Sequence, residues 1–276
     1  MPFRQYVRES IAAGLDETYR FETWRDAAAG VAYYDVHVSV IEQRETCVPL
    51  LRRVLERPGQ LILESGCGTG RWMAFFARSG HRVIGLDDSP GPLQVARAHD
   101  PALRLVRGDA RCAPFPDATF DVVFSAYVAE HFDDGPLAFF REARRLLKPG
   151  GLLLVVVPYA NLFRRLVTHR VLQAFYLWAR LRGIGLAFNE HRFGQRELLG
   201  WLETAGFRIE HVEPDDYRYP WAKGLCVDLG ALVTPANLPA GSWDLNRPGR
   251  VLARGLQRLS PWAACAGIFA VARAVP

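Results

Sequence analysis

The chain has 276 residues, half of them hydrophobic and 23% charged, a composition that indicates a packed globular protein rather than extended disorder. Its net charge of +5 comes almost entirely from scattered arginines, which gives little support to a nucleic-acid-binding protein. Five widely spaced cysteines without a C-x-x-C pair argue against a disulfide framework and a structural zinc site, and favour a reducing cytoplasm. The first ten residues carry no apolar run, so we expect no signal peptide.

Residues 1–43 are mixed and rich in aromatic side chains, and we expect them to form a helical N-terminal appendage or lid. From residue 44 to 158, short apolar runs alternate with segments of helical period. Strands that alternate with helices imply right-handed crossovers and a parallel sheet, so this segment is the predicted cofactor-binding core. The predicted strands are 61–63, 83–86, 103–106, 120–125 and 152–157, and the predicted helices between them are 72–77, 92–98 and 137–147.

Residues 159–190 interrupt the alternation and predict a lid insertion. Its long apolar segment carries Arg165, His169, Gln173 and Arg180 near one stripe of a helix. Residues 191–276 return to the sheet with predicted strands at 207–212 and 267–273, separated by a proline-rich insertion at about 214–262. The whole pattern predicts an α/β fold with a Rossmann-like doubly wound sheet, mostly parallel with an antiparallel last strand. We expect a single domain with a helical N-terminal appendage and lid insertions.

A glycine-rich segment, Glu64–Gly70, lies directly after the first predicted strand and before a helix. Glycines let the backbone approach a ligand closely, and a helix start offers free N–H groups. Asp87 ends the next strand, where a carboxylate can accept both hydroxyls of a ribose. The spacing is G-x-G-x-G, and Arg71 stands where a dinucleotide-binding loop needs a small residue. The loop therefore favours a nucleoside cofactor other than NAD.

Further segments extend this pattern in order: Val83–Pro90 after the glycine loop, then Gly108–Ala110, Phe115–Val123 and Leu147–Gly151. With the loop they resemble the motifs of class I S-adenosylmethionine (SAM)-dependent methyltransferases, and in particular their small-molecule branch. The resemblance runs from about residue 60 to 158, and more weakly beyond. It implies SAM as the cofactor and a methyltransferase activity.

The resemblance also implies roles for single residues. The loop backbone would hold the methionine part of SAM, Glu64 would lie beneath it, and Asp87 would bind the ribose. Asp109 would accept from the adenine amino group, and Ser125 would lie along the methionine end. The expected cofactor-binding set is Glu64, Gly66, Cys67, Gly68, Gly70, Asp87, Asp88, Asp109, Ala110 and Ser125.

Two histidines are candidate general bases, because an imidazole near its ordinary pKa removes protons at neutral pH. His131 follows the fourth strand, where the acceptor pocket of the family opens, and His191 precedes a later helix. Packing roles are the alternative for both. The expected substrate pocket comprises Tyr33, Tyr34, Tyr127 and Tyr159. The paired carboxylates of the loops lack a third ligand at metal spacing, so we expect no metal.

The aromatic lid favours a small apolar or aromatic acceptor, such as a lipid-like molecule, and its basic amphipathic helix could rest on a membrane surface. Nothing in the sequence chooses among O-, N- and C-methylation. Three alternatives stay open: a SAM-fold protein that binds the cofactor without methyl transfer, an NAD(P) oxidoreductase, and a nucleic-acid methyltransferase. A nucleic-acid methyltransferase lacks support, because the segment after the fourth strand has none of the Pro-Pro or Pro-Cys signals of base methylases.

Overall fold

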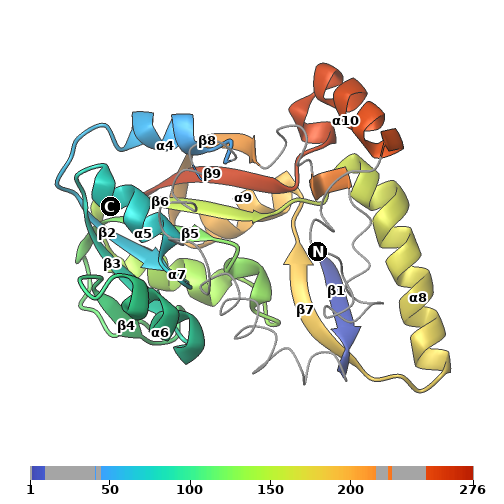
Figure 1. Ribbon diagram of the computed structural model, residues 1–276, viewed down its shortest axis with the longest axis horizontal. Helices are drawn as coiled ribbons and strands as arrows, with labels where there is room; N and C mark the ends of the chain where they lie inside the picture. Colours follow the sequence, from blue (N-terminus) through green and yellow to red (C-terminus); the bar gives the residue numbers. More distant parts are fainter. Residues whose placement is uncertain (1, 10–40, 42–44, 216–222, 226–246, 276) are drawn as a thin grey trace.

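The computed structural model describes residues 2–9, 41, 45–215, 223–225 and 247–275. A seven-stranded sheet with the order β4-β3-β2-β5-β6-β9-β8 forms the centre of the molecule (Figure 1). Strand β9 pairs antiparallel with both of its neighbours, and the other pairings are parallel. The expected Rossmann-like sheet with an antiparallel last strand is confirmed. The strands are β2 (Leu61–Ser65), β3 (Arg82–Asp87), β4 (Leu105–Arg107), β5 (Phe120–Ala126), β6 (Leu147–Pro158), β8 (Phe207–Asp215) and β9 (Gly267–Ala274).

Helices cover both faces of this sheet because its central strands are apolar on both sides. On β5, Val123 faces the cluster that contains α7 and α9, whereas Val122 and Phe124 face the cluster that contains α4 and α5. The same two-residue alternation continues along β6 and β9. The helices are α4 (Val48–Val54), α5 (Arg71–Arg78), α6 (Pro90–His99), α7 (Leu137–Leu146) and α9 (Gln195–Thr204).

A second, two-stranded sheet was not expected from the sequence. Strand β1 (Phe3–Arg8) pairs antiparallel with β7 (Leu186–Arg192). The helical prediction is therefore wrong for residues 3–8, and the rest of the appendage, 10–40, lies outside the described residues. The physical reason is a period of two: Gln5 and Val7 are buried while their neighbours are more exposed.

The segment that we expect to form a lid, 159–190, contains a π-helical turn, Arg164–Thr168, that leads into α8 (His169–Leu181). Its base is tied to the end of the sheet through buried Asn161, whose amide donates to the carbonyl oxygens of Gly224 and Cys265. Helix α8 lies on the outer side of β1 and β7, beyond the right-hand end of the sheet in Figure 1. A further helix, α10 (Arg247–Leu259), lies within the C-terminal insertion. Among the described helices, none combines the length and the apolar character needed to cross a membrane.

Candidate functional site

The glycine loop, Gly66–Gly70, connects the end of β2 to the start of α5. Its three glycines have φ angles of 79°, 51° and 78°. Residues that carry a side chain rarely adopt this left-handed backbone region. The N–H groups of Gly66 and Cys67 both donate to the carbonyl oxygen of Leu86, at 2.7 and 3.0 Å. These bonds fix the loop against the end of β3, which brings the two expected cofactor segments together.

A side chain would fit at one of these glycines but not at another. A Cβ atom on Gly66 would lie 2.1 Å from Cγ2 of Val128, so the loop packs tightly against the segment after β5. A Cβ atom on Gly68 would meet no atom within 4 Å. The backbone at Gly68 therefore faces open space, as a loop that cradles a cofactor requires. The open space beside the Gly68 backbone therefore fits SAM, the cofactor that the family resemblance implies.

Asp87, at the end of β3, is bonded to the loop. Its carboxylate accepts N–H groups from Gly68 at 2.8 Å and from Ser89 at 2.9 Å. Burial raises the pKa of Asp87 above its ordinary value, while these two N–H donors act in the opposite direction. Each oxygen keeps a second lone pair, so the same carboxylate can also accept ribose hydroxyls.

The third cofactor segment is joined to the second. The N–H group of Gly108, after β4, donates to the backbone oxygen of Asp87 at 3.0 Å. Asp109, the expected adenine acceptor, is exposed, and its carboxylate lies 2.8 Å from Nη2 of Arg111. The hydrogen bonds from the Arg111 side chain lower the pKa of Asp109. An incoming adenine amino group would therefore share this carboxylate with Arg111. The two other expected residues here are Asp88, which follows Asp87 and is exposed, and Ala110, which follows Asp109.

Two buried polar side chains near the loop hold atoms without hydrogen-bond partners. Glu64, on β2, is 3% exposed, and burial raises its pKa well above the ordinary value of a carboxyl group. Its Oε2 atom and the Oγ atom of Ser125, on β5, have no partner within the described part of the chain. Since buried polar atoms are nearly always paired, both sites accommodate a polar ligand group or a water molecule.

The structure places both His131 and His191 at strand β7, but gives them different surroundings. His131 is exposed, and its Nδ1 atom donates to the carbonyl oxygen of Asn189 on β7 at 2.9 Å. His191 is buried on β7 with its ring 4.8 Å from that of Phe188, and burial lowers its pKa. The imidazole of His191 is therefore neutral at pH 7. Their assignment as general bases stays a prediction.

Of the expected substrate tyrosines, Tyr127 and Tyr159 lie at the carboxyl edge of the sheet. Tyr127 follows β5 with a φ angle of 60°, which is rare for a bulky residue and recurs at functional sites. Tyr159 follows β6, and its ring packs edge-on against Trp262 at 5.4 Å. Tyr33 and Tyr34 lie outside the described residues.

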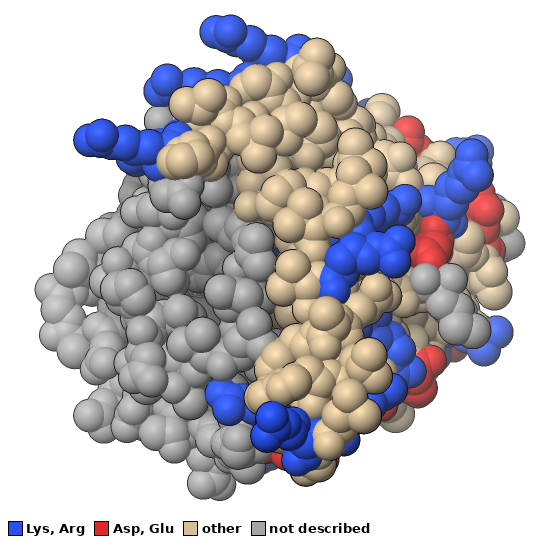
Figure 2. Space-filling view, turned by 90° about the vertical axis from the view of Figure 1, so that its right-hand side faces the viewer, with Lys and Arg blue, Asp and Glu red and all other residues tan. Residues whose placement is uncertain are grey.

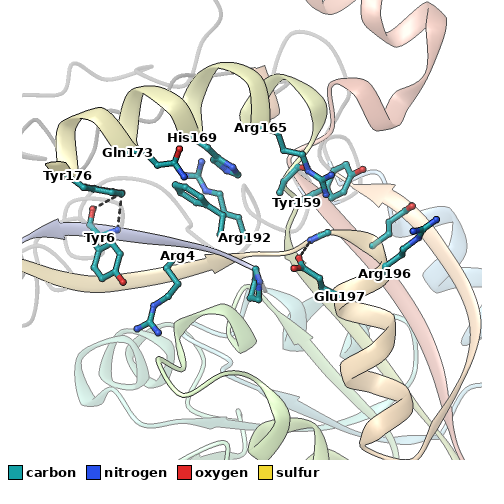
Figure 3. A pocket seen from close by; sticks show the side chains of 15 residues that line it. Arg4, Tyr6, Tyr159, Arg165, His169, Gln173, Tyr176, Arg192, Arg196 and Glu197 are labelled. Carbon is teal, nitrogen blue, oxygen red and sulfur yellow. Dashed lines mark hydrogen bonds between the residues drawn. The ribbon is translucent and has the colours of Figure 1, made fainter.

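A cavity of about 890 Å³ opens between α8, the β1–β7 sheet and the start of α9 (Figure 3). Among the expected site residues that the structure describes, Tyr159 is the one that lines it. One end of the cavity is aromatic, where the hydroxyl of Tyr176 accepts the N–H group of Tyr6 at 2.9 Å. The other end is basic and contains Arg165, next to Tyr159 (Figure 3). Volume and lining are typical of a pocket for a small molecule with a polar group.

The sequence predicted part of the lining of this cavity. The expected stripe comprised Arg165, His169, Gln173 and Arg180. Its first three members, at the four-residue spacing of a helix face, line the cavity, and Arg180 does not. Arg192 was missed because it reaches the cavity only through the pairing of β7 with β1, where it stands opposite Phe3. That pairing joins segments about 180 residues apart, and no local pattern predicts it.

Comparison with known proteins places the chain in a family. The methyltransferase domain family matches residues 63–155. A malonyl-(acyl-carrier protein) O-methyltransferase from Serratia marcescens is 38% identical over 112 residues, 41% of this chain and 44% of the relative. A ubiquinone biosynthesis O-methyltransferase from Xanthomonas campestris is 33% identical over 170 residues, 59% of this chain and 69% of the relative. The solved structure of a SAM-dependent methyltransferase from Methanosarcina mazei superposes with a TM-score of 0.56, at 17% identity, over 82% of this chain and 97% of the other.

The sheet order and the glycine loop define an α/β domain that binds a nucleoside cofactor. The chain belongs to the class I SAM-dependent methyltransferase family, whose cofactor is S-adenosyl-L-methionine. It spans about half the length of the curated relatives that it matches, 44% for the Serratia protein. The expected family and cofactor are confirmed.

Proposed function

We propose that this protein transfers a methyl group from SAM to a small, largely apolar acceptor, and that it does so in a reducing cytoplasm. The hydrogen bond between the carboxylate of Asp87 and the N–H group of Gly68 supports this proposal most directly. It joins the ribose-binding carboxylate to the glycine loop, so that one rigid unit would grip both the sugar and the amino-acid part of SAM. The bound cofactor would supply an activated methyl group, and the protein would contribute alignment and proximity.

Formation of S-adenosylhomocysteine would test the proposal. With a panel of quinols, phenols and long-chain acids as acceptors, we expect the product to form with at least one apolar acceptor. A protein that binds SAM but forms no product with any acceptor would be the alternative, a SAM-fold protein without transfer activity. A protein that shows no saturable SAM binding by calorimetry would contradict the proposal itself.

A peripheral contact with membranes would fit a lipid-like acceptor. Eleven large hydrophobic side chains are exposed in the described part of the chain. Ten of them lie on the lid around α8 or on α10, among them Leu177, Leu181 and Leu259 at 62%, 78% and 82% exposure. Residues 143–189 and 247–275 contain no acidic residue. Figure 2 looks onto this side of the molecule, where uncharged residues are bordered by arginines. Apolar and cationic side chains together favour an anionic lipid surface.

The double variant Leu177→Ser and Leu181→Ser is expected to bind vesicles of phosphatidylglycerol and phosphatidylcholine at least tenfold more weakly than the native protein. Each leucine that enters the lipid contributes about 1.5–3 kcal/mol. Co-sedimentation measures the partition coefficient. Val275→Ser is the matched control, because Val275 is also exposed, at 45%, but lies at the end of the sheet. Equal binding by the double variant and the control would rule out this face as the contact.

A further inference from the structure

The basic end of the cavity is built from three elements that the cofactor site does not use. Arg165, in the turn before α8, donates from Nε to the carbonyl oxygen of Ala160 at 2.7 Å, which fixes the direction of its guanidinium group. A Cβ atom on Gly194 would lie only 2.8 Å from Nη2 of Arg165. The guanidinium group therefore lies directly against Gly194, the residue before α9.

The first turn of α9 adds backbone donors to the same place. Gly194 is the N-cap of this ten-residue helix, and its N–H group is already bonded to the Glu197 carboxylate at 2.9 Å. The N–H groups of Gln195 and Arg196 come next, and the geometry of a helix gives them no acceptor within it. Both residues line the cavity. Free N–H groups and the positive end of the helix dipole favour an anionic group at this point.

A buried histidine points to a ligand independently of the helix. His169, on α8, lines the cavity and is 6% exposed. Its ring stacks on that of Phe3 at 3.6 Å, and its Nε2 atom has no hydrogen-bond partner in the described part of the chain. Burial, with Arg192, Arg164 and Arg165 nearby, lowers the pKa of His169 to about 3. The ring is thus surrounded by positive charge.

Acidic side chains do not balance this charge. Among the described residues that line the cavity there are four arginines and one carboxylate, that of Glu197. Arg192, at 1% exposure, is paired with Glu190 at 3.0 Å, and Arg4 is paired with Asp133 and points away from α8 in Figure 3. Within the described residues, Arg165 and Arg196 have no carboxylate within salt-bridge distance. An uncompensated positive cluster in a partly enclosed site calls for an anion.

We propose that this end of the cavity binds an oxyanion, a phosphate ester or a carboxylate, carried by the otherwise apolar methyl acceptor. The aromatic end formed by Tyr6 and Tyr176 would hold the apolar body of the same molecule. Tyr159 lies between the basic end and the carboxyl edge of the sheet, which is the edge that carries the glycine loop. The identification of the ligand as the acceptor rests on the proposed function, but the oxyanion site itself does not.

Calorimetry with three ten-carbon probes would test the site: decyl phosphate, decanoate and decanol. We expect at least one of the two anionic probes to bind tenfold or more tightly than decanol, and the stronger one identifies the oxyanion. The double variant Arg165→Gln and Arg196→Gln should lose that preference, with at least tenfold weaker binding of the anionic probe. Both side chains are exposed, so the variant should fold normally. Arg170→Gln is the matched control, an exposed arginine on α8 that does not line the cavity.

Decanol binding as tightly as both anionic probes would overturn the proposal. Native affinity of the double variant for the anionic probe would overturn it as well. SAM affinity, measured in the same samples, should be the same in the native protein, the double variant and the control. A preparation that binds the anionic probe through Arg165 and Arg196 but takes up no SAM would contradict the proposed function and leave the oxyanion site standing.

Discussion

Replacing Asp87 by alanine is expected to weaken SAM binding by about 10–100-fold, because hydrogen bonds to a charged group contribute about 1.5–3 kcal/mol each. The variant would lose the proposed ribose contacts, and it also loses the acceptor for the N–H groups of Gly68 and Ser89. The loop would then lose part of its support before the cofactor arrives. Isothermal calorimetry with SAM measures the effect directly.

The conservative variant Asp87→Asn separates the two contributions. An asparagine keeps one oxygen and can still accept the N–H group of Gly68, so the loop stays supported while a ribose acceptor and the negative charge are lost. Its affinity for SAM should lie between those of the native protein and the alanine variant. Asp100→Ala is the control, since Asp100 lies at the other end of α6. An Asp87→Ala protein that binds SAM with native affinity would remove this carboxylate from the cofactor site.

The features that could be predicted from the sequence are those with local signals. Several strands of the central sheet contain continuous apolar runs, and the glycine loop joins one of these strands, β2, directly to a helix. The three cofactor segments follow strands that are neighbours in the order β4-β3-β2, so the topology brings their carboxyl ends together. A sequence with alternating strands and helices permits few other arrangements.

The features that could not be predicted depend on contacts between distant segments. Strand β1 is held by β7, and an alternating pattern of only six residues does not identify such a partner. The same pairing places Arg192 in the cavity and buries His191, which the sequence presented as a candidate base. Arg111 was also missed as the partner of Asp109, because rotamer choice and not spacing decides where its long side chain goes.

The clash at Gly66 predicts a large loss of stability. A methyl group there would overlap Val128, at 2.1 Å from Cγ2, and the backbone is left-handed, with a φ angle of 79°. Strain at such a φ angle costs about 1–2 kcal/mol, and overpacking costs about 1–3 kcal/mol. We therefore expect Gly66→Ala to lower the free energy of unfolding by about 2–5 kcal/mol, measured by urea denaturation without SAM. The double variant Gly66→Ala and Val128→Ala should recover the part of the free energy of unfolding that is lost to overpacking.

Gly68→Ala is the matched comparison, because the φ angle of Gly68 is also positive, at 51°, but its Cβ position is open. In the absence of SAM, this variant should lower the free energy of unfolding only by the backbone strain, about 1–2 kcal/mol. Its methyl group would occupy the space assigned to the cofactor, so SAM affinity should fall at least tenfold. Equal stabilities for the two alanine variants would show that Val128 does not confine the loop. Native SAM affinity in Gly68→Ala would show that the open side of the loop is not where the cofactor binds.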